Sequence, residues 1–554
     1  MGIPSYFSYI VKNHVNIIKK WLKNKMAINN LYMDCNSIIY DAVRNINFSN
    51  ITDTPTKTII GKVIVKIEEY IGLLAPDNCV FIAFDGVAPV AKLEQQRNRR
   101  YKSWYQNEIM DKIFQKKADS SWNTTAITPG TVFMNDLNIA INTHFCNNVA
   151  KYNVKNIIVS TSDEAGEGEH KIFDYIRTNR ASHTDATTVI YGLDADLIML
   201  SINHLPISKK IYLFRETPEF IKTLDNSLEP NETYLLDIPE LAQIITLNMN
   251  NGVELTSDQQ THSTTSIEFS RPPSPNGYGL LQTNRIYDYI FLCFFLGNDF
   301  MPHFPAANIR TGGIDKLLNA YKATIGGTNE NLTDGKTIYW KNVRKMVAFL
   351  AAQEDEFMRA EMNLRNKREK NYFPIETPEQ KYAKFDAIPT YEREQEKYIN
   401  PFKDNWQHRY YKSLFKIDID EERSKEISIN YMQGLEWTMK YYTTNCPDWR
   451  WCYKHNYPPL FQDLIKHIPY FDTTFIKENT SKPVSPLVQL CYVLPRNSLS
   501  LLPEKLYGRL KDERLELYPC DAEFVWTYSK YFWEAHVELP EIDIGELEQF
   551  VSEK

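Results

Sequence analysis

Long hydrophobic runs, paired cysteines and targeting signals are all missing from this sequence, and each absence excludes a class of protein. No uninterrupted apolar run approaches the roughly 18 residues that suggest a membrane-spanning helix, so we expect no membrane protein. The eight cysteines are scattered, without CxxC spacing or a secretory signal, which indicates mostly buried thiols in a reducing compartment. Cys446, Cys452 and His455 match no common zinc-finger spacing, so we interpret the two cysteines as structural thiols.

The sequence also lacks an excess of positive charge. Its 554 residues include 63 Lys and Arg against 70 Asp and Glu, a formal net charge of −7. Taken alone, this balance argues mildly against a nucleic-acid partner, because phosphate binding requires local positive charge. The acidic residues gather in a few short motifs and in the tail, however, while a compact basic run extends from Arg97 to Lys102. The charge distribution therefore leaves a nucleic-acid site open.

Up to about residue 230, short β-rich runs alternate with longer helical patterns. We predict strands at residues 31–33, 80–84, 157–160 and 188–191, and acidic residues closely follow each run. Such alternation is typical of a mostly parallel sheet flanked by helices. The sequence thus predicts an α/β fold for residues 1–230.

The rest of the chain divides into four predicted segments. Residues 231–280 form an insert whose polar part, 256–277, is expected to be a mobile surface loop. Residues 281–370 are helical, with helices at 287–296 and at about 342–370, and complete the active site. Residues 371–400 are predicted to be an irregular connector. Residues 401–554, rich in Tyr, Trp and Pro, are predicted to form an irregular second lobe packed on the first.

Acidic residues recur where the predicted strands end. In parallel α/β sheets the carboxyl ends of the strands share one edge, so residues that follow them converge in space. Asp299 belongs to the same set, although it follows a predicted helix. Seven carboxylates are therefore expected to face one pocket: Asp34, Asp85, Glu167, Glu169, Asp194, Asp196 and Asp299.

Seven negative charges in one pocket require cations to neutralise them. Ligation by oxygen alone suits two Mg²⁺ ions, for which Mn²⁺ can substitute, and such a pair promotes phosphodiester hydrolysis. A single acid after a strand is more commonly a helix N-cap or a turn residue. Because Glu167 with Glu169 and Asp194 with Asp196 place two acids where one cap suffices, we prefer the metal interpretation.

Five motifs within the first 303 residues together resemble those of the Xrn-type 5′→3′ exoribonucleases. They are Met1-Gly2-Ile3-Pro4, Asp85-Gly86-Val87-Ala88-Pro89, Gly166-Glu167-Gly168-Glu169-His170-Lys171, Tyr191-Gly192-Leu193-Asp194-Ala195-Asp196-Leu197-Ile198-Met199 and Gly297-Asn298-Asp299-Phe300-Met301-Pro302-His303. Residues 431–437 and 446–451 extend the resemblance into the second lobe.

The resemblance implies a PIN-like, flap-endonuclease-like fold in which a second helical and irregular lobe encloses the active site. It assigns metal binding and catalysis to the same seven acids that the strand ends indicate. The chain also resembles a minimal member of the family, one that stops soon after the nuclease core. Its implied substrate is single-stranded RNA with a 5′ monophosphate, which is degraded to mononucleotides during RNA and mRNA decay.

A basic helix after the Asp85 motif is the predicted phosphate site. Helical spacing places Lys92, Gln96, Arg99 and Arg100 on one face. Guanidinium groups grip phosphate oxygens in pairs, and by resemblance these four residues form the 5′ monophosphate pocket. For an arbitrary charge run a solvated helix face is the usual explanation, but here the run directly follows the acidic motif. A tight pocket would exclude capped and triphosphorylated ends.

Aromatic side chains are candidates for stacking on RNA bases, a contribution of roughly 1–3 kcal/mol per base. We name Trp449 and Trp451, although aromatic stripes more often belong to a core. Tyr40 stands where the family usually has a histidine, and Ser37 replaces a glycine of the same motif. Tyrosine stacks and donates a hydrogen bond but carries no positive charge, so turnover or its pH dependence is expected to differ from the family pattern.

Two other functions compete with the exoribonuclease. A structure-specific 5′ flap endonuclease uses the same sheet and acids, but the basic 5′ pocket and the second lobe favour attack at an end. A non-catalytic RNA-binding scaffold is disfavoured because all seven acids are present. We expect a monomer in the cytoplasm, with the nucleus as the alternative. The sequence does not reveal which proteins it binds.

Overall fold

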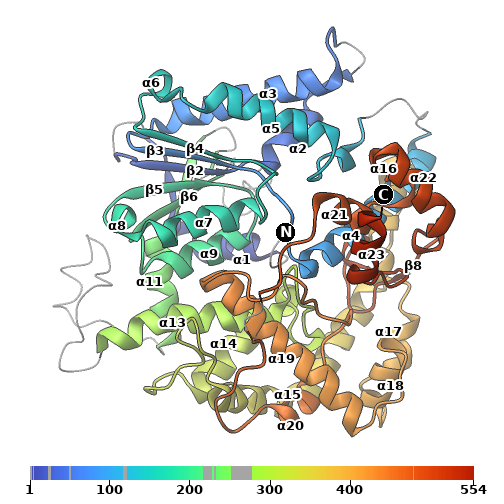
Figure 1. Ribbon diagram of the computed structural model, residues 1–554. Coiled ribbons are helices and arrows are strands. Elements are labelled where there is room, and N and C mark those ends of the chain that lie inside the picture. The colour runs from blue at the N-terminus through green and yellow to red at the C-terminus, as the bar shows by residue number, and fades with distance from the viewer. Residues whose placement is uncertain are drawn as a thin grey trace.

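The computed structural model describes residues 3, 5–22, 26–48, 51–115, 122–215, 228–229, 232–250, 278–477 and 480–553. The predicted polar loop at 256–277 and part of the Met1 to Pro4 motif lie outside these residues. Figure 1 shows a sheet flanked by helices, with a larger helical part below it and to its right. No helix in the described ranges is long and apolar enough to cross a bilayer.

A sheet of seven described strands forms the centre of the first part. In spatial order its strands are β1 (Ile18–Lys20), β7 (Tyr234–Asp237), β6 (Lys210–Arg215), β5 (Thr187–Tyr191), β2 (Asn30–Asp34), β3 (Cys79–Ala83) and β4 (Asn156–Ser160). The five strands from β6 to β4 are parallel. At one side of the sheet β7 pairs antiparallel with β6, and β1 pairs antiparallel with β7. The four strands predicted from sequence are confirmed as β2 to β5, and the mostly parallel sheet is confirmed with them.

Successive side chains of the strands point to opposite faces of the sheet and pack into two separate hydrophobic cores. Leu31 and Met33 of β2 pack with helices on one face, and Tyr32 packs with helices on the other. The first face carries α2 (Asn36–Arg44), α3 (Pro55–Leu74) and α5 (Val132–Phe145), which lie above the sheet in Figure 1. The second face carries α7 (Gly168–Thr178), α9 (Asp196–His204), α11 (Ile238–Met249) and α13 (Tyr278–Cys293).

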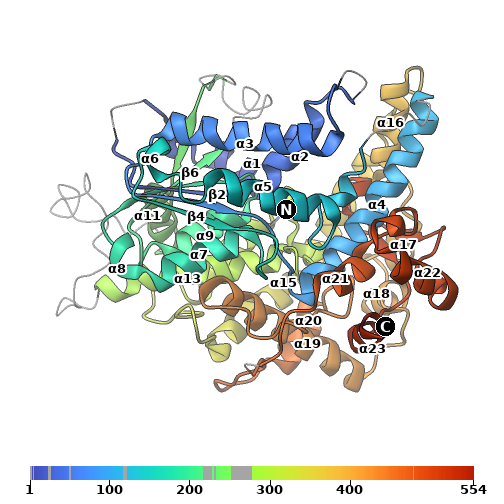
Figure 2. The same ribbon diagram turned by 45° about the horizontal axis from the view of Figure 1, so that its top comes forward.

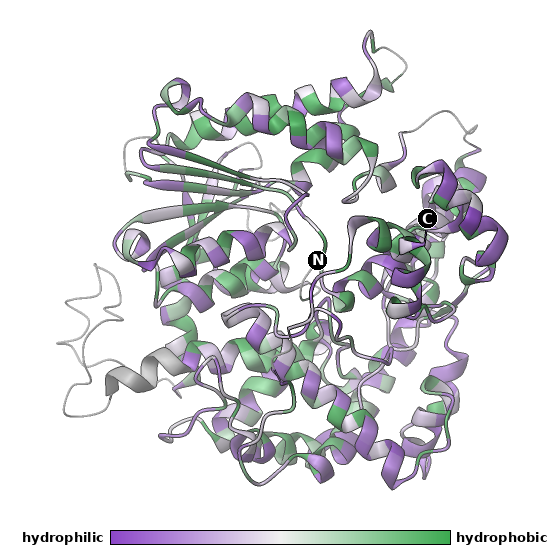
Figure 3. Cartoon of the chain, viewed as in Figure 1, coloured by the Kyte–Doolittle hydropathy of each residue, from purple (hydrophilic) through white to green (hydrophobic). Residues whose placement is uncertain are grey.

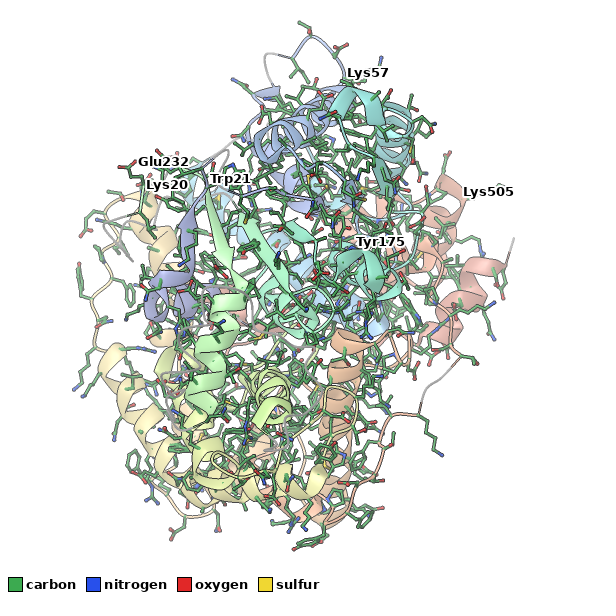
Figure 4. The ribbon with its side chains drawn as sticks, turned by 90° about the vertical axis from the view of Figure 1, so that its left-hand side faces the viewer. Lys20, Trp21, Lys57, Tyr175, Glu232 and Lys505 are labelled. Carbon is green, nitrogen blue, oxygen red and sulfur yellow. The ribbon has the colours of Figure 1, made fainter. Side chains whose placement is uncertain are left out.

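Charged side chains protect the exposed edge of the sheet. Lys20 of β1 forms a 3.1 Å ion pair with Glu232, and Figure 4 shows both side chains at this edge beside Trp21. Lys19 pairs with Glu240 at 2.6 Å. Charged groups on a short edge strand disfavour pairing with another chain. Three short helices complete this part: α1 (Tyr6–Asn13), α6 (Val149–Tyr152) and α8 (Arg180–His183).

The second part of the chain is more helical than the sequence indicated. Its helices are α14 (Gly313–Thr324), α15 (Trp340–Arg368), α16 (Pro378–Asp386), α17 (Glu394–Ile399), α18 (Trp406–Leu414), α19 (Glu421–Thr443), α20 (Phe461–His467), α21 (Pro486–Val493), α22 (Glu504–Glu513) and α23 (Ile544–Ser552). A small sheet pairs β8 (Glu523–Val525) with β9 (His536–Glu538). In Figure 3 many of these helices are banded in purple and green, as expected for helices with one buried side. The predicted helices at 287–296 and 342–370 are confirmed within α13 and α15.

The prediction of an irregular connector at 371–400 is wrong. Two helices, α16 and α17, occupy most of this segment. The start of α16 is fixed by a capping box, because Thr377 Oγ1 accepts a hydrogen bond from the Gln380 N–H while the Gln380 side chain accepts one from the Thr377 N–H. Pro378 at the first helical turn favours the same start. Both local signals are visible in the sequence.

A long helix connects the two parts. Helix α4 (Val90–Phe114) begins beside the carboxyl edge of the sheet and packs against α16 and α21 of the second part, as Figure 2 shows. The Val90 N–H donates to the Trp449 carbonyl at 3.0 Å, so the second part also holds the first turn of this helix. The predicted basic face therefore lies where the two parts of the chain meet.

Candidate active site

The carboxyl edge of the parallel strands carries the predicted acids. Asp34 is the last residue of β2, Asp85 lies two residues after β3, and Asp194 follows β5. Glu167 and Glu169 stand at the start of α7, the helix that follows β4. Because β5, β2, β3 and β4 are adjacent and parallel, these positions share one edge of the sheet.

Carboxylate oxygens at this edge approach one another closely. One oxygen from each of Asp34, Asp85 and Glu169 lies within 4.8 Å of the other two. Glu167, Glu169 and a ring nitrogen of His170 form a second such group. Residues separated by up to 135 positions in the chain, Asp34 and Glu169, are thereby brought to ligand distance of one another, as the strand ends predict.

Gly168 allows this approach because it has no side chain. A Cβ at this position would lie 2.6 Å from Asp34 Oδ1 and 3.5 Å from Asp85 Oδ1. The Gly168 N–H instead donates a 2.7 Å hydrogen bond to Asp85 Oδ1. The glycine between Glu167 and Glu169 therefore lets the start of α7 lie directly against the carboxylates of β2 and β3.

Lys92 brings Asp299 into the cluster. Its Nζ lies 2.5 Å from Glu167 Oε2 and 2.6 Å from Asp299 Oδ2, and all three residues are buried. Burial alone would lower the pKa of Lys92, but Asp299 and Glu167 raise it well above its ordinary value. Burial would likewise raise the pKa of Asp299, yet the Lys92 ammonium holds it below its usual range. Both groups are therefore charged at neutral pH.

Three of the other acids, Asp34, Glu169 and Asp196, are buried beside like charges. Burial and the neighbouring Asp85 raise the pKa of Asp34 well above its ordinary value, and burial and Glu167 do the same for Glu169. Burial and Asp299 raise the pKa of Asp196 to about 7. Without a counter-ion, this cluster therefore holds protons that carboxylates do not normally retain at neutral pH.

A divalent cation fits the cluster chemically. Asp34 Oδ1 and Asp196 Oδ1 are buried and have no hydrogen-bond partner among the described residues. Unsatisfied buried carboxylate oxygens are costly unless a cation or a proton neutralises them. Hard divalent ions prefer ligands that are all oxygen, which the seven acids supply. The structure thus brings together the residues that the sequence assigned to metal binding.

The basic face of α4 lines the same cavity as the acids. Lys92, Gln96, Arg99 and Arg100 surround a cavity of about 230 Å³. Five of the seven predicted acids line the same cavity, and we call them its acidic wall and the α4 residues its basic wall: Asp34, Asp85, Glu167, Glu169 and Asp194. Asp299 and Asp196 are not part of the lining, although Asp299 is joined to it through Lys92. Cationic and anionic side chains therefore line one cavity.

Two residues of the basic face each have a buried polar atom without a hydrogen-bond partner in the described part of the chain. Arg100 donates from Nη2 to Thr128 Oγ1 at 2.7 Å, whereas its buried Nη1 has no partner in the described part of the chain. Gln96 Oε1 is also buried without a partner there. Burial lowers the pKa of Arg100 to about 10, which still leaves it charged at neutral pH. An anion in the cavity would supply the acceptor that the guanidinium lacks.

The three candidate stacking residues lie in different surroundings. Tyr40 on α2 lines the cavity together with Ser37. Trp451 stacks on Trp437 with ring centroids 5.4 Å apart, and Trp449 holds the start of α4 through its carbonyl. Neither tryptophan is among the residues that line the cavity. Base stacking by these residues stays a prediction.

Several residues at the site were not identified from sequence. Asn36 donates to Asp85 Oδ2 at 2.5 Å and accepts from the Asp85 N–H, which fixes that carboxylate. Tyr441 of α19 donates to Glu167 Oε1 at 2.9 Å and stacks on His170 at 3.7 Å. Asn36 lies two residues after Asp34 and was within reach of sequence reasoning. Tyr441 is 274 positions from Glu167, and no local pattern connects them.

Comparison with known proteins supports the same assignment along nearly the whole chain. Residues 1–217 match the model described as the XRN 5′-3′ exonuclease N-terminus, and residues 282–397 and 374–553 match the Xrn1 helical domain. The chain is 26% identical to the 5′-3′ exoribonuclease 2 homolog of Drosophila melanogaster, with 98% of this chain and 70% of the relative covered. It is 26% identical to 5′-3′ exoribonuclease 2 of Gallus gallus, covering 98% and 69%. It is 25% identical to 5′-3′ exoribonuclease 1 of Saccharomyces cerevisiae, covering 98% and 42%.

Proposed function

Because this chain belongs to the XRN 5′-3′ exonuclease family, we propose that it degrades single-stranded RNA from a 5′ monophosphate end, one nucleotide at a time. The observation that carries the proposal is the shared cavity. Its one wall carries carboxylates from four strand ends, and its other wall carries the cationic face of α4. A terminal phosphate held on the basic wall would place the next phosphodiester beside the acidic wall.

We assign the acidic wall and the adjoining acids to divalent cations, Mg²⁺ in the first instance with Mn²⁺ as a substitute. The ligands would come from Asp34, Asp85, Glu167, Glu169, Asp194, Asp196 and Asp299. Two such ions supply an activated water and stabilise the departing oxygen of a phosphodiester. The unpartnered oxygens of Asp34 and Asp196 and the absence of sulfur from the set support hard cations.

The protein's own residues orient both the acids and the substrate. Asn36 and the Gly168 N–H hold Asp85 in place, and Tyr441 and Lys92 hold Glu167. Preorganised groups of this kind need no rearrangement when charge develops in the transition state. Lys92 also lies at the border of the two walls, so the same ammonium balances two carboxylates and lines the phosphate side of the cavity.

Selectivity for the 5′ monophosphate follows from the size and charge of the cavity. The cavity of about 230 Å³, part of it bordered by the acids, suits a small anion better than a bulky cap structure. Arg99 and Arg100 offer guanidinium forks that match phosphate oxygens. RNAs that differ only in a 5′ monophosphate, triphosphate or cap test this directly. Equal rates for all three would refute the pocket.

The same surroundings favour an exonuclease over a flap endonuclease. Ile127, Pro129 and the second-part residue Gln489 line the cavity together with the basic face, which favours binding of a strand end over a continuing strand. A circular RNA of the same sequence as a linear substrate separates the two activities. The exonuclease leaves the circle intact and consumes the linear form, whereas an endonuclease cuts both.

A further inference from the structure

Gln489 is the residue through which the second part of the chain reaches the cavity. It lies at the centre of α21, has no exposed surface, and lines the cavity together with Asp85, Lys92 and Arg99. Most glutamines are exposed, and a buried one normally has its amide fully hydrogen-bonded. The position of this side chain therefore requires an explanation.

The orientation of the Gln489 amide is fixed by one hydrogen bond. The backbone N–H of Ala88 donates to Gln489 Oε1 at 3.1 Å. Because a backbone N–H requires an acceptor, the amide oxygen must face Ala88 and the Nε2 donor must face away from it. That Nε2 is buried and has no hydrogen-bond partner in any described segment. One end of the amide thus holds the loop that carries Asp85, and the other end is unsatisfied.

The packing of α21 limits how far Gln489 can move to find a partner for its Nε2 within the protein. Helix α21 packs on α4 and is capped by Ser485, whose hydroxyl accepts the Val488 N–H. On its other side lies Gly130, where φ is +90° and an added Cβ would come within 2.8 Å of Pro486 Cβ. The helix is therefore held between the basic helix and the loop that forms the cavity wall.

The chemistry of the cavity identifies the missing partner. The cavity that Gln489 lines also contains the cationic groups of Lys92, Arg99 and Arg100, which favour an anion rich in acceptors as the occupant. A phosphate oxygen would satisfy the Gln489 donor, as it would the unpartnered Nη1 of Arg100. We propose that Gln489 is a fifth phosphate-binding residue, whose Nε2 donates a hydrogen bond to the 5′ phosphate of the RNA.

This inference rests on the proposed exoribonuclease function and adds a specificity role for the second part of the chain. Gln489 would make recognition of the 5′ end depend on correct docking of α21 against α4 and the Asp85 loop. The phosphate would in turn connect both parts of the chain, since its remaining contacts come from α4.

Two substitutions separate phosphate binding from a purely structural role. Gln489→Met keeps the approximate volume but removes both hydrogen bonds. Gln489→Glu keeps an acceptor for the Ala88 N–H and, when ionised, replaces the Nε2 donor by a negative charge facing the phosphate. Gln462→Met is the control, because Gln462 is a second-part glutamine that bonds Asp355 far from the cavity lining.

Each protein is assayed for kcat/KM on two RNAs of one sequence, with a 5′ monophosphate or a 5′ hydroxyl. Loss of a hydrogen bond to a charged group is expected to lower the monophosphate value roughly ten- to a hundredfold, with the larger loss in Gln489→Glu. The hydroxyl value should change less than about threefold by the same reasoning. Inhibition by inorganic phosphate should weaken in both variants. Gln462→Met should match the unsubstituted protein on both RNAs.

Three results would overturn the inference. Equal losses on both RNAs would mean that Gln489 acts only through the Asp85 loop or contacts a base. Unchanged activity in Gln489→Glu, with a loss confined to Gln489→Met, would also assign it a structural role. If the unsubstituted protein degrades RNA but ignores the state of the 5′ end, the phosphate pocket itself fails, and this failure is visible without any variant.

Discussion

Replacing one of the active-site acids by its neutral isostere is expected to stabilise the metal-free protein. Asp196 is 5% exposed, and burial beside Asp299 raises its pKa from 3.8 to about 7. Asparagine has the same shape and can still accept the hydrogen bond that Tyr442 donates to Asp196. The variant Asp196→Asn thus removes a charge without leaving a cavity.

The sign and size of the effect follow from the pKa of Asp196. A carboxyl whose folded pKa is raised contributes stability below its unfolded pKa, near 3.8, and that contribution is lost as pH rises through about 7. The shift is about three units, each worth about 1.4 kcal/mol, so the ionised group costs about 4 kcal/mol at most. Asp196→Asn avoids this loss, and its advantage should be absent in acid and fully developed at about pH 8.

Thermal unfolding in EDTA, recorded across this pH range, measures the effect. We expect the unfolding temperature of Asp196→Asn to exceed that of the unsubstituted protein by a few degrees at alkaline pH and to coincide with it in acid. A divalent cation should then stabilise the unsubstituted protein more than the variant, because the ion neutralises the charge that the variant lacks. Asp136→Asn, at an exposed position on α5, is the control and should change neither curve. A variant that is less stable than the unsubstituted protein at alkaline pH would refute the reasoning.

Three further substitutions test the arrangement of the site and the helices around it. Lys92→Met breaks two buried ion pairs and should lower kcat/KM on monophosphorylated RNA roughly a hundredfold or more, whereas a loss below about threefold would deny the residue its bridging role. Gly168→Ala places a methyl group 2.6 Å from Asp34 Oδ1, so hydrolysis should be abolished while circular dichroism stays unchanged, and full activity would contradict the packing. Gly508→Ala, in the interior of α22 with no atom within 4 Å of the new Cβ, should raise the unfolding free energy by about 0.5–1 kcal/mol without affecting activity, and destabilisation would show that the site is not open.

The sequence was informative where local patterns determine structure. Short apolar runs identified β2 to β5, and the rule that parallel strands end at one edge was sufficient to group Asp34, Asp85 and Asp194. Strands β1, β6 and β7 were not predicted; β7 pairs antiparallel with both of its neighbours, so it falls outside the alternating pattern of parallel strands and helices.

Long-range contacts limited the prediction of the site. The four residues of the basic face of α4 were predicted from helical spacing to lie together, and they do line one cavity. That Lys92 pairs with Glu167 and Asp299 could not be read from sequence, because the contact to Asp299 spans 207 positions and depends on how the second part docks. Gln489 was missed for the same reason, since its partner Ala88 is 401 positions away. The compartment, the monomeric state and any protein partner stay predictions.

The most direct test of the central claim follows both ends of one RNA. A 5′-monophosphorylated RNA is labelled either at its first or at its last nucleotide and digested with Mg²⁺, with EDTA, and with EDTA followed by excess Mg²⁺. Convergence of the acids on cations beside a phosphate pocket predicts that the first label leaves at once as a mononucleotide, that EDTA stops the reaction and that Mg²⁺ restores it. Early loss of the last label, internal fragments, or digestion that continues in EDTA would contradict it.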